Sequence, residues 1–336
     1  MRTPTFAAQV LFAARRGDIY RCGAYSCYFP ACSPHNPKDC TVIAHNALAR
    51  LSRTFLASAM LLAFGIHAAE TRKVAANVRY RTDKDCAGNA YMQERCVLDI
   101  DYPEGAGNAV VILWFHGGGL TGGNKHIPRD FYTRNTKQPI IVVAANYRLA
   151  GKHDSMAIDC IRDAAAALAW VFAHIAEYGG DPAKVFVSGH SAGGYLSMMI
   201  GMDPRWLAEQ GCDISQIKGL VPLSGQAITH FRIRSERGMN NKQPLVDDFA
   251  PIYHASQGAK IAPMLLLTGD REMELLGRYE ENALLVRMMK INGHKDITLY
   301  EFQGYGHGMA APATTPLINF VNRVSPPPAP PAEKAK

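Results

Sequence analysis

Three patterns are missing from this 336-residue sequence, and each absence removes a class of protein. No two cysteines are separated by just two residues, so the paired ligands of a structural zinc site are absent and we expect no metal. No Gly-Lys-Ser or Gly-Lys-Thr occurs, which excludes the phosphate-binding loop of nucleotide hydrolases. No segment repeats along the chain, so a solenoid is not expected.

A concentration of positive charge is also missing from most of the chain. The formal net charge is +7, from 36 Lys and Arg against 29 Asp and Glu. Seven of the basic and two of the acidic residues lie in residues 1–69, which leaves 29 basic and 27 acidic residues in the remainder. This near-neutral remainder has no basic stripe, so nucleic acid is not an expected partner. Its length and the 48% hydrophobic content suit one large α/β domain.

Residues 50–69 have the pattern of a secretory signal peptide. Arg50 and Arg53 precede an apolar run at 54–66, which is too short to span a bilayer comfortably, and small residues end the segment at Ala68 and Ala69. No cysteine follows directly, so a lipid anchor is not indicated and no stable membrane anchor is expected after cleavage. We therefore expect a periplasmic or secreted protein.

The two ends of the chain are expected to lie outside the fold. Residues 1–49 show no hydrophobic periodicity, and we expect them to be disordered or not translated, with the true start downstream. Residues 325–336 form a Pro-rich tail for which we also expect disorder.

Four cysteines remain after the signal segment, namely Cys86, Cys96, Cys160 and Cys212. Four cysteines allow three pairings, and the sequence does not choose among them. A disulfide between Cys86 and Cys96 would close a short loop before a strand and would suit an exported protein.

Residues 70–324 alternate between strand-like and helix-like patterns. Segments 77–81 and 97–101 alternate apolar and polar residues, as half-exposed strands of an antiparallel edge do. Continuous apolar runs predict buried strands at 109–115, 140–145, 185–188, 218–223 and 264–268, and an alternating run predicts a last strand at 297–302. This alternation predicts a mostly parallel sheet of about eight strands with helices on both faces. The polar segment 224–258 is predicted to be a small lid.

One pentapeptide predicts a nucleophile. Gly189-His190-Ser191-Ala192-Gly193 follows a buried strand and precedes a helix-like run. A serine on a sharp turn between strand and helix is held out at the carboxyl end of the sheet, and flanking glycines allow the two elements to come close. The alternative interpretation is an ordinary glycine-serine turn in a βα unit.

A glycine-rich loop after the first buried strand predicts an oxyanion hole. His116-Gly117-Gly118-Gly119 follows the strand at 109–115. Attack of a serine on an acyl group creates a negatively charged oxygen, which backbone N–H groups can stabilise. The expected donors are the N–H groups of Gly118, Gly119 and Ala192.

The remaining residues of a Ser-His-acid triad are expected in the last two loops. His307 lies in Gly304-Tyr-Gly-His-Gly-Met309, just after the last strand, and is the expected base. The loop after the strand at 264–268 contains Asp270, Glu272 and Glu274, and spacing alone leaves all three open as the acid.

These motifs together resemble those of the α/β-hydrolase esterases, over about residues 97–324. They look closest to bacterial carboxylesterases related to hormone-sensitive lipase and to feruloyl-esterase-like and arylformamidase-like hydrolases. The resemblance implies an α/β-hydrolase fold and a carboxylic-ester hydrolase that needs no metal or other cofactor. In such proteins the acid commonly lies three residues past the loop glycine, which implies Glu272, with Asp270 as the alternative.

The expected function is hydrolysis of small-molecule carboxylic esters, with short acyl groups, through an acyl-enzyme. An arylformamidase-like amide hydrolase would use the same residues and is the alternative within this fold. A non-catalytic binding module is the alternative of another class, but such a protein would be expected to lack Ser191, His307 or the donor glycines. The sequence does not indicate an oligomeric state.

Overall fold

The computed structural model describes residues 19–22, 25–28, 71–134 and 137–327. The chain divides into two units, Met1–Ala69 and Glu70–Lys336. In the first unit, β1 (Ile19–Cys22) and β2 (Tyr25–Tyr28) pair antiparallel. The predicted signal segment and most of residues 1–49 lie outside the described residues, as do residues 328–336 of the Pro-rich tail.

The second unit is built around an eight-stranded sheet with the strand order β10-β9-β8-β7-β5-β6-β4-β3. The strands are β3 (Arg72–Arg79), β4 (Val97–Pro103), β5 (Ala109–Phe115), β6 (Ile140–Ala145), β7 (Gly180–His190), β8 (Gly219–Leu223), β9 (Met264–Gly269) and β10 (Ile297–Phe302). From β6 to β10 the neighbours are parallel, whereas β3 and β4 pair antiparallel at the opposite edge. The predicted eight-stranded, mostly parallel sheet is confirmed.

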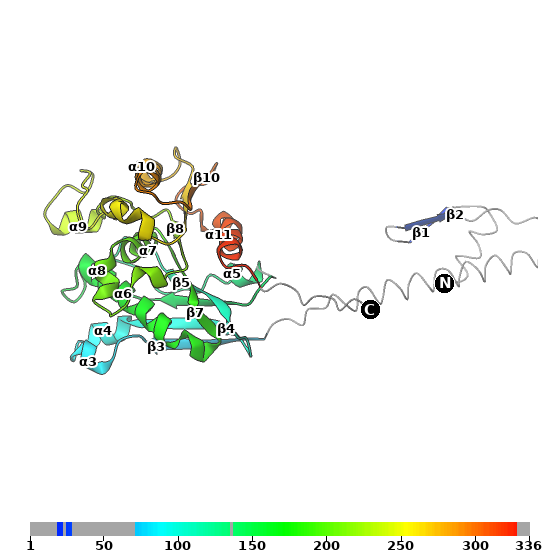
Figure 1. Cartoon of the computed structure of the whole chain (residues 1–336), viewed down its shortest axis with the longest axis horizontal. Helices are drawn as coiled ribbons and strands as arrows, with labels where there is room; N and C mark the ends of the chain where they lie inside the picture. The colour runs from blue at the N-terminus through cyan, green and yellow to red at the C-terminus, as the bar shows by residue number, and fades with distance from the viewer. Residues whose placement is uncertain (1–18, 23–24, 29–70, 135–136, 328–336) are drawn as a thin grey trace, which may run out of the picture. The chain divides into compact units, whose positions relative to one another are not determined.

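Helices cover both faces of the sheet (Figure 1). The α-helices are α3 (Asp83–Cys86), α4 (Ala90–Arg95), α5 (Asp130–Thr133), α6 (Ala157–His174), α7 (Ala192–Met202), α8 (Pro204–Ala208), α9 (Phe231–Glu236), α10 (Arg278–Ile291) and α11 (Ala310–Val324). The described residues also form the 3-10 helices η1 (Ile175–Tyr178), η2 (Ile214–Gln216) and η3 (Pro251–Lys260).

Two hydrophobic cores explain this layering, because alternate residues of a strand point to opposite faces. Val111 and Leu113 of β5 pack in the core formed with α6, α7 and α10. Their neighbours Val110 and Ile112 pack in the core formed with α5 and α11. All four side chains are fully buried, which accounts for the uninterrupted apolar run in this strand.

The polar segment 224–258 is fastened to the body of the domain. Glu236 of α9 accepts hydrogen bonds from the Ala157 N–H at the start of α6, at 3.0 and 3.1 Å. Arg237 pairs with Asp247, and the Thr229 hydroxyl donates to Asp247 at 2.7 Å. The first contact ties α9 to the start of α6, and the other two join parts of the segment to each other.

The predicted disulfide between Cys86 and Cys96 is wrong. Both thiols are free, as are those of Cys160 and Cys212. Cys86 ends α3, whereas Cys96 follows α4 and packs into the core beside Tyr80, so the two cysteines are directed to different surroundings. Burial raises the pKa of the Cys96 thiol to about 12, so this group stays protonated and inert at neutral pH.

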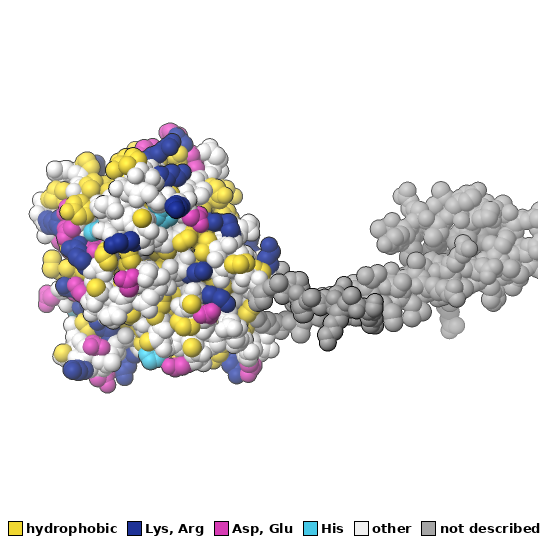
Figure 2. Space-filling model, viewed as in Figure 1, with side chains coloured by type: hydrophobic (Ala, Val, Ile, Leu, Met, Phe, Trp, Pro, Cys, Tyr) yellow, Lys and Arg dark blue, Asp and Glu magenta, His cyan; other side chains and the backbone are white. Residues whose placement is uncertain are grey.

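Charges of both signs are mixed over the face of the second unit seen in Figure 2, without a large block of one sign. This agrees with the near-neutral charge balance of the sequence. None of the helices in the described part of the chain is both long enough and apolar enough to cross a membrane.

Candidate active site

Ser191 occupies a strained turn between β7 and α7. Its backbone has φ of 57° and ψ of −116°, which a non-glycine residue rarely adopts. A Cβ added at Gly189 would lie 2.7 Å from the Phe115 carbonyl oxygen, and one at Gly193 would overlap that same oxygen. The two glycines are therefore required so that α7 can start against β5 and β7. The turn has the geometry expected of a nucleophile elbow.

His307 reaches Ser191 across the carboxyl end of the sheet. Its Nε2 lies 2.9 Å from the Ser191 hydroxyl oxygen. The histidine loop follows β10, whereas the serine follows β7, so the fold joins residues that are 116 positions apart. The structure thus brings together the serine and the histidine that the sequence indicated.

The carboxylate that contacts His307 belongs to Glu274. His307 Nδ1 lies 2.6 Å from Glu274 Oε1. The prediction of Glu272, and its alternative Asp270, are therefore wrong. Asp270 accepts backbone N–H groups of its own and the neighbouring loop, from Glu272 and Gly304, at 3.0 and 2.9 Å.

A turn in the loop after β9 explains this correction. The N–H groups of Met273 and Glu274 both donate to the Asp270 carbonyl, so the chain coils after Asp270. The coil directs Glu274 back toward the sheet, where its Oε2 accepts the Gly269 N–H at 3.2 Å, and leaves Glu272 exposed. Because of this turn, the carboxylate that contacts His307 lies two residues later in the sequence than the common position of the acid. A sequence signal was present: Glu274 lies between apolar residues, while Asp270 to Glu272 form a charged run.

Ser224 is a fourth polar side chain in the site, and sequence reasoning missed it. Its hydroxyl donates to Glu274 Oε2 at 2.7 Å and lies 3.0 Å from His307 Nδ1. It follows β8 with a φ of 48° and is almost fully buried. Arg278 and Asn282 of α10 hold this segment by donating to the carbonyl oxygens of Ser224 and Gly225. No motif in the sequence marks this serine.

The environment of Glu274 keeps its carboxylate ionised. Burial by itself raises the pKa, but hydrogen bonds from His307, Ser224 and the Leu275 N–H outweigh it and lower the pKa from 4.5 to about 2. An ionised acid at Nδ1 holds the imidazole with Nε2 facing Ser191, as a general base requires.

The glycine-rich loop lies against the elbow. A Cβ added at Gly117 would be 3.3 Å from Ser191 Cβ. Gly118 and Gly119 have φ of 111° and 63°, and a Cβ at Gly118 would overlap the Gly122 carbonyl. Within the described part of the chain, the N–H groups of Gly118, Gly119 and Ala192 donate to no protein atom.

His116 contacts both the glycine-rich loop and Tyr147. Its Nδ1 lies 2.7 Å from the Gly117 carbonyl oxygen, and its ring stacks on Tyr147 with centroids 4.3 Å apart. Burial lowers the pKa of His116 to about 4, so the ring is neutral at pH 7. The Tyr147 hydroxyl donates to the His116 carbonyl at 2.9 Å.

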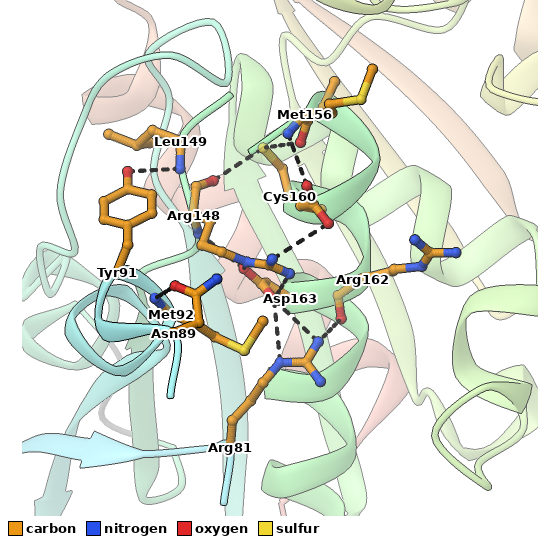
Figure 3. A network of polar contacts seen from close by, with 12 residues as sticks. Arg81, Asn89, Tyr91, Met92, Arg148, Leu149, Met156, Cys160, Arg162 and Asp163 are labelled. Atoms are coloured by element: carbon orange, nitrogen blue, oxygen red, sulfur yellow. Dashed lines mark hydrogen bonds and ion pairs between the residues drawn. The ribbon is translucent and has the colours of Figure 1, made fainter. Parts of the chain in front are cut away.

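A buried ion-pair network holds the segment that carries Tyr147 (Figure 3). Arg148 donates two hydrogen bonds to Asp163 of α6, at 2.7 and 2.8 Å, and Arg81 pairs with the same carboxylate. Asp163 is fully buried and therefore depends on these partners. The Asn146-Tyr-Arg-Leu149 motif thus fixes the stack of Tyr147 on His116.

Two more side chains border the site. His190 Nε2 lies 2.7 Å from the His307 carbonyl oxygen, which ties the histidine loop to the elbow. The ring of Phe231, from α9, is 3.0 Å from the position of a Cβ at Gly119. Among the described residues, no group of three or more His, Cys, Asp or Glu is arranged to hold a metal ion.

Comparisons with known proteins show similarity to esterases. The family model BD-FAE matches residues 98–219. The chain is 30% identical to carboxylesterase 1E of Mus musculus over 193 residues, which is 55% of this chain and 31% of the relative. It is 40% identical to the probable carboxylic ester hydrolase LipM of Mycobacterium tuberculosis over 123 residues, 35% of this chain and 28% of the relative. The chain therefore spans about a third of the length of these curated relatives.

Among solved structures, an esterase from Thermogutta terrifontis with propionate bound matches with a TM-score of 0.57 and 24% identity. The match covers 78% of this chain and 97% of that one. This likeness shows that the chain shares the α/β-hydrolase fold of that esterase, and over part of its length the chain is similar in sequence to carboxylesterases.

Proposed function

We propose that this protein is a serine carboxylesterase. The observation that carries the proposal is the hydrogen-bonded series from Ser191 through His307 to Glu274, with distances of 2.9 and 2.6 Å. A non-catalytic binding module would have no need of a strained serine joined to a histidine and a buried carboxylate.

The proposed reaction has two halves. Ser191 Oγ attacks the ester carbonyl carbon while His307 Nε2 takes the hydroxyl proton. The C–O bond to the alcohol then breaks, and His307 returns that proton to the leaving oxygen, which gives an acyl-enzyme and a free alcohol. Water activated by His307 attacks the acyl-enzyme and releases the carboxylic acid. Glu274 stays ionised throughout and stabilises the imidazolium.

The oxyanion is stabilised by the unengaged N–H groups of Gly118, Gly119 and Ala192. Ala192 begins α7, so the positive end of this helix dipole also faces the developing charge. Such preorganised donors are worth about 3 kcal/mol each in related chemistry.

We assign short acyl groups to the site. The ring of Phe231 lies 3.0 Å from the position of a Cβ at Gly119, and we infer that it limits the space for an acyl chain beside the donor loop. The hydrogen bond from the Ala157 N–H to Glu236 holds α9, which carries Phe231, against α6. A steep fall in rate from acetate to octanoate esters is the expected consequence.

Hydrolysis of p-nitrophenyl acetate, butyrate and octanoate by wild type and Ser191→Ala tests the proposal. Wild type should turn over acetate and butyrate well, and the alanine variant should lose at least about 10³-fold in kcat. Equal rates for the two proteins would overturn the proposal. Rates that rise toward octanoate would overturn the assignment of short acyl groups alone.

We also propose export through the segment at 50–69, which lies outside the described residues. The proposal rests on the sequence pattern, since the free cysteines provide no support for an oxidising compartment. We expect the protein recovered from the periplasm or the medium to have the mass of a chain that begins at Ala69 or Glu70. An uncleaved chain confined to the cytoplasm would contradict it.

A further inference from the structure

The end of β8 contacts both the nucleophile and the acid of the site. The carbonyl of Leu223, the last residue of β8, accepts the Ser191 N–H at 2.8 Å, which holds the serine turn against this strand. The next residue, Ser224, donates its hydroxyl to Glu274 Oε2 at 2.7 Å. Two consecutive residues therefore join the serine turn to the loop of the acid.

The Glu274 carboxylate has two partners on each of its oxygens. Oε1 lies 2.6 Å from His307 Nδ1 and accepts the Leu275 N–H at 2.8 Å. Oε2 accepts the Ser224 hydroxyl at 2.7 Å and the Gly269 N–H at 3.2 Å. An ionised carboxylate offers about four acceptor positions, so these partners occupy all of them. The Ser224 hydroxyl makes the shorter of the two contacts with Oε2.

This contact is closed to bulk water. The Glu274 side chain is fully buried, and Ser224 is 1% exposed. A buried acceptor that loses its donor is left without the compensation that solvent would give. Removal of the hydroxyl would leave Oε2 with the longer Gly269 contact alone, and would remove a contact that opposes rotation of the carboxylate away from His307.

The pattern of donors and acceptors links Ser224 to the acid rather than directly to the base. Its Oγ also lies 3.0 Å from His307 Nδ1. A hydroxyl has one proton, and an ionised carboxylate can only accept, so the Ser224 proton is directed to Glu274. The Nδ1 proton faces Glu274 Oε1, which at 2.6 Å is its nearer partner. Ser224 therefore affects His307 mainly through Glu274.

The backbone of Ser224 is held on both sides. Its N–H donates to the Leu267 carbonyl at 2.7 Å, and its carbonyl accepts a hydrogen bond from the Arg278 guanidinium. Arg278 is itself held by Glu281, with Nε 2.8 Å from the carboxylate. Ser224 has a φ of 48°, in the left-handed region that residues with side chains rarely adopt. These contacts maintain a strained conformation and fix the direction in which the hydroxyl leaves the backbone.

We propose that Ser224 is a positioning residue, which holds the Glu274 carboxylate in the orientation that accepts the hydrogen bond from His307 Nδ1. It acts through the carboxylate and takes part in no bond that forms or breaks. Its burial and its contact with the acid argue against a role as a second nucleophile. The inference rests on the proposed esterase function and adds a fourth side chain to the same site.

The experiment measures kcat and KM for p-nitrophenyl butyrate with wild type and Ser224→Ala. The variant should lose roughly 10-fold in kcat, as expected when a hydrogen bond to a charged group is removed. KM should stay within about two-fold of wild type, because the hydroxyl acts on the acid rather than on the substrate.

Ser188→Ala is the matched control, since it removes the hydroxyl of another fully buried serine. The Ser188 hydroxyl donates to the Val221 carbonyl at 2.6 Å instead of to the acid. This variant should keep kcat within about two-fold of wild type. A kcat for Ser224→Ala that matches that of Ser188→Ala would overturn the inference.

A double-variant cycle distinguishes positioning of the acid from other effects. In a Glu274→Ala background the hydroxyl has no carboxylate to hold, so the further change Ser224→Ala should alter kcat by less than about two-fold. A loss of roughly 10-fold in both backgrounds would show that Ser224 acts on the fold or directly on His307, and would also overturn the inference.

Circular dichroism and the melting temperature show whether Ser224→Ala folds. Should it not fold, Ser224→Gly replaces it in both comparisons, because glycine adopts a φ of 48° without strain. Ser191→Ala is measured beside these variants. Its inactivity, together with wild-type kcat in Ser224→Ala, would remove the positioning role and leave the esterase function standing. Full activity in Ser191→Ala would instead remove the esterase function itself.

Discussion

Several groups form hydrogen bonds with the Glu274 carboxylate at once, which distinguishes it from the exposed carboxylate of Glu272. His307, Ser224 and two backbone N–H groups converge on it, whereas Glu272 is exposed. Replacing Glu274 by Gln should remove the charge that stabilises the imidazolium and should lower kcat by roughly 10³-fold. Steady-state kinetics with p-nitrophenyl butyrate measures this.

Glu272→Gln is the matched control, since it makes the same chemical change two residues away. Its kcat should stay within about two-fold of wild type. A collapse in Glu272→Gln, with Glu274→Gln active, would contradict the assignment.

The lowered pKa of Glu274 also predicts a dependence of stability on pH. Its pKa is about 2 in the folded chain and 4.5 as the reference for an unfolded one, so the unfolded state binds the proton first as pH falls. The contribution to the free energy of unfolding is present above about pH 4.5 and is lost as pH falls toward about 2. Urea unfolding of wild type and Glu274→Gln across this range should show a steeper loss in wild type. Parallel pH profiles would contradict it.

The residues that could be predicted from sequence are those fixed by local motifs. Ser191 lies in a turn whose glycines belong to the pentapeptide motif, and His307 lies in the loop after the last strand. The identity of the acid depends on the conformation of the loop at 270–274. The role of Ser224 depends on a contact between loops that are 50 residues apart. Neither arrangement leaves a periodic pattern in the sequence.

At the scale of elements, the junction of β7 with α7 depends on glycines that admit no side chain. An added Cβ at Gly193 would overlap the Phe115 carbonyl, so Gly193→Ala should destabilise the domain by about 3 kcal/mol or prevent folding. Gly107→Ala, where nothing lies within 4 Å of the added atom, should change stability by less than about 0.5 kcal/mol. Thermal unfolding of both variants tests this, and equal melting temperatures would count against the close approach.

The central strands were predictable because both of their faces are buried, which enforces continuous apolar runs. The short helices α3 and α4 were not predicted, since four to six residues show no helical period. Cys86 ends α3 and α4 separates it from Cys96, and both thiols are free. The arrangement of residues 224–258 rests on side-chain contacts such as that of Glu236 with α6, which no local pattern encodes.

At the scale of the whole molecule, the second unit contains both hydrophobic cores and every residue of the candidate site. A chain that starts at Glu70 should therefore fold by itself and keep wild-type kcat. Its melting temperature should lie within about 2 °C of the full chain, because both hydrophobic cores lie within the second unit. Calorimetry of both chains measures this, and a drop of ten degrees would show that the first unit contributes to the fold.

The most direct test of the account is to find which residue carries the covalent intermediate. Wild type is treated with diethyl p-nitrophenyl phosphate, which transfers a diethylphosphoryl group to an activated serine, and the digested protein is examined by mass spectrometry. The account predicts one adduct per chain, on Ser191, with complete loss of esterase activity, and no adduct on the Ser191→Ala variant. An adduct on another residue, or full esterase activity in the variant, would contradict it.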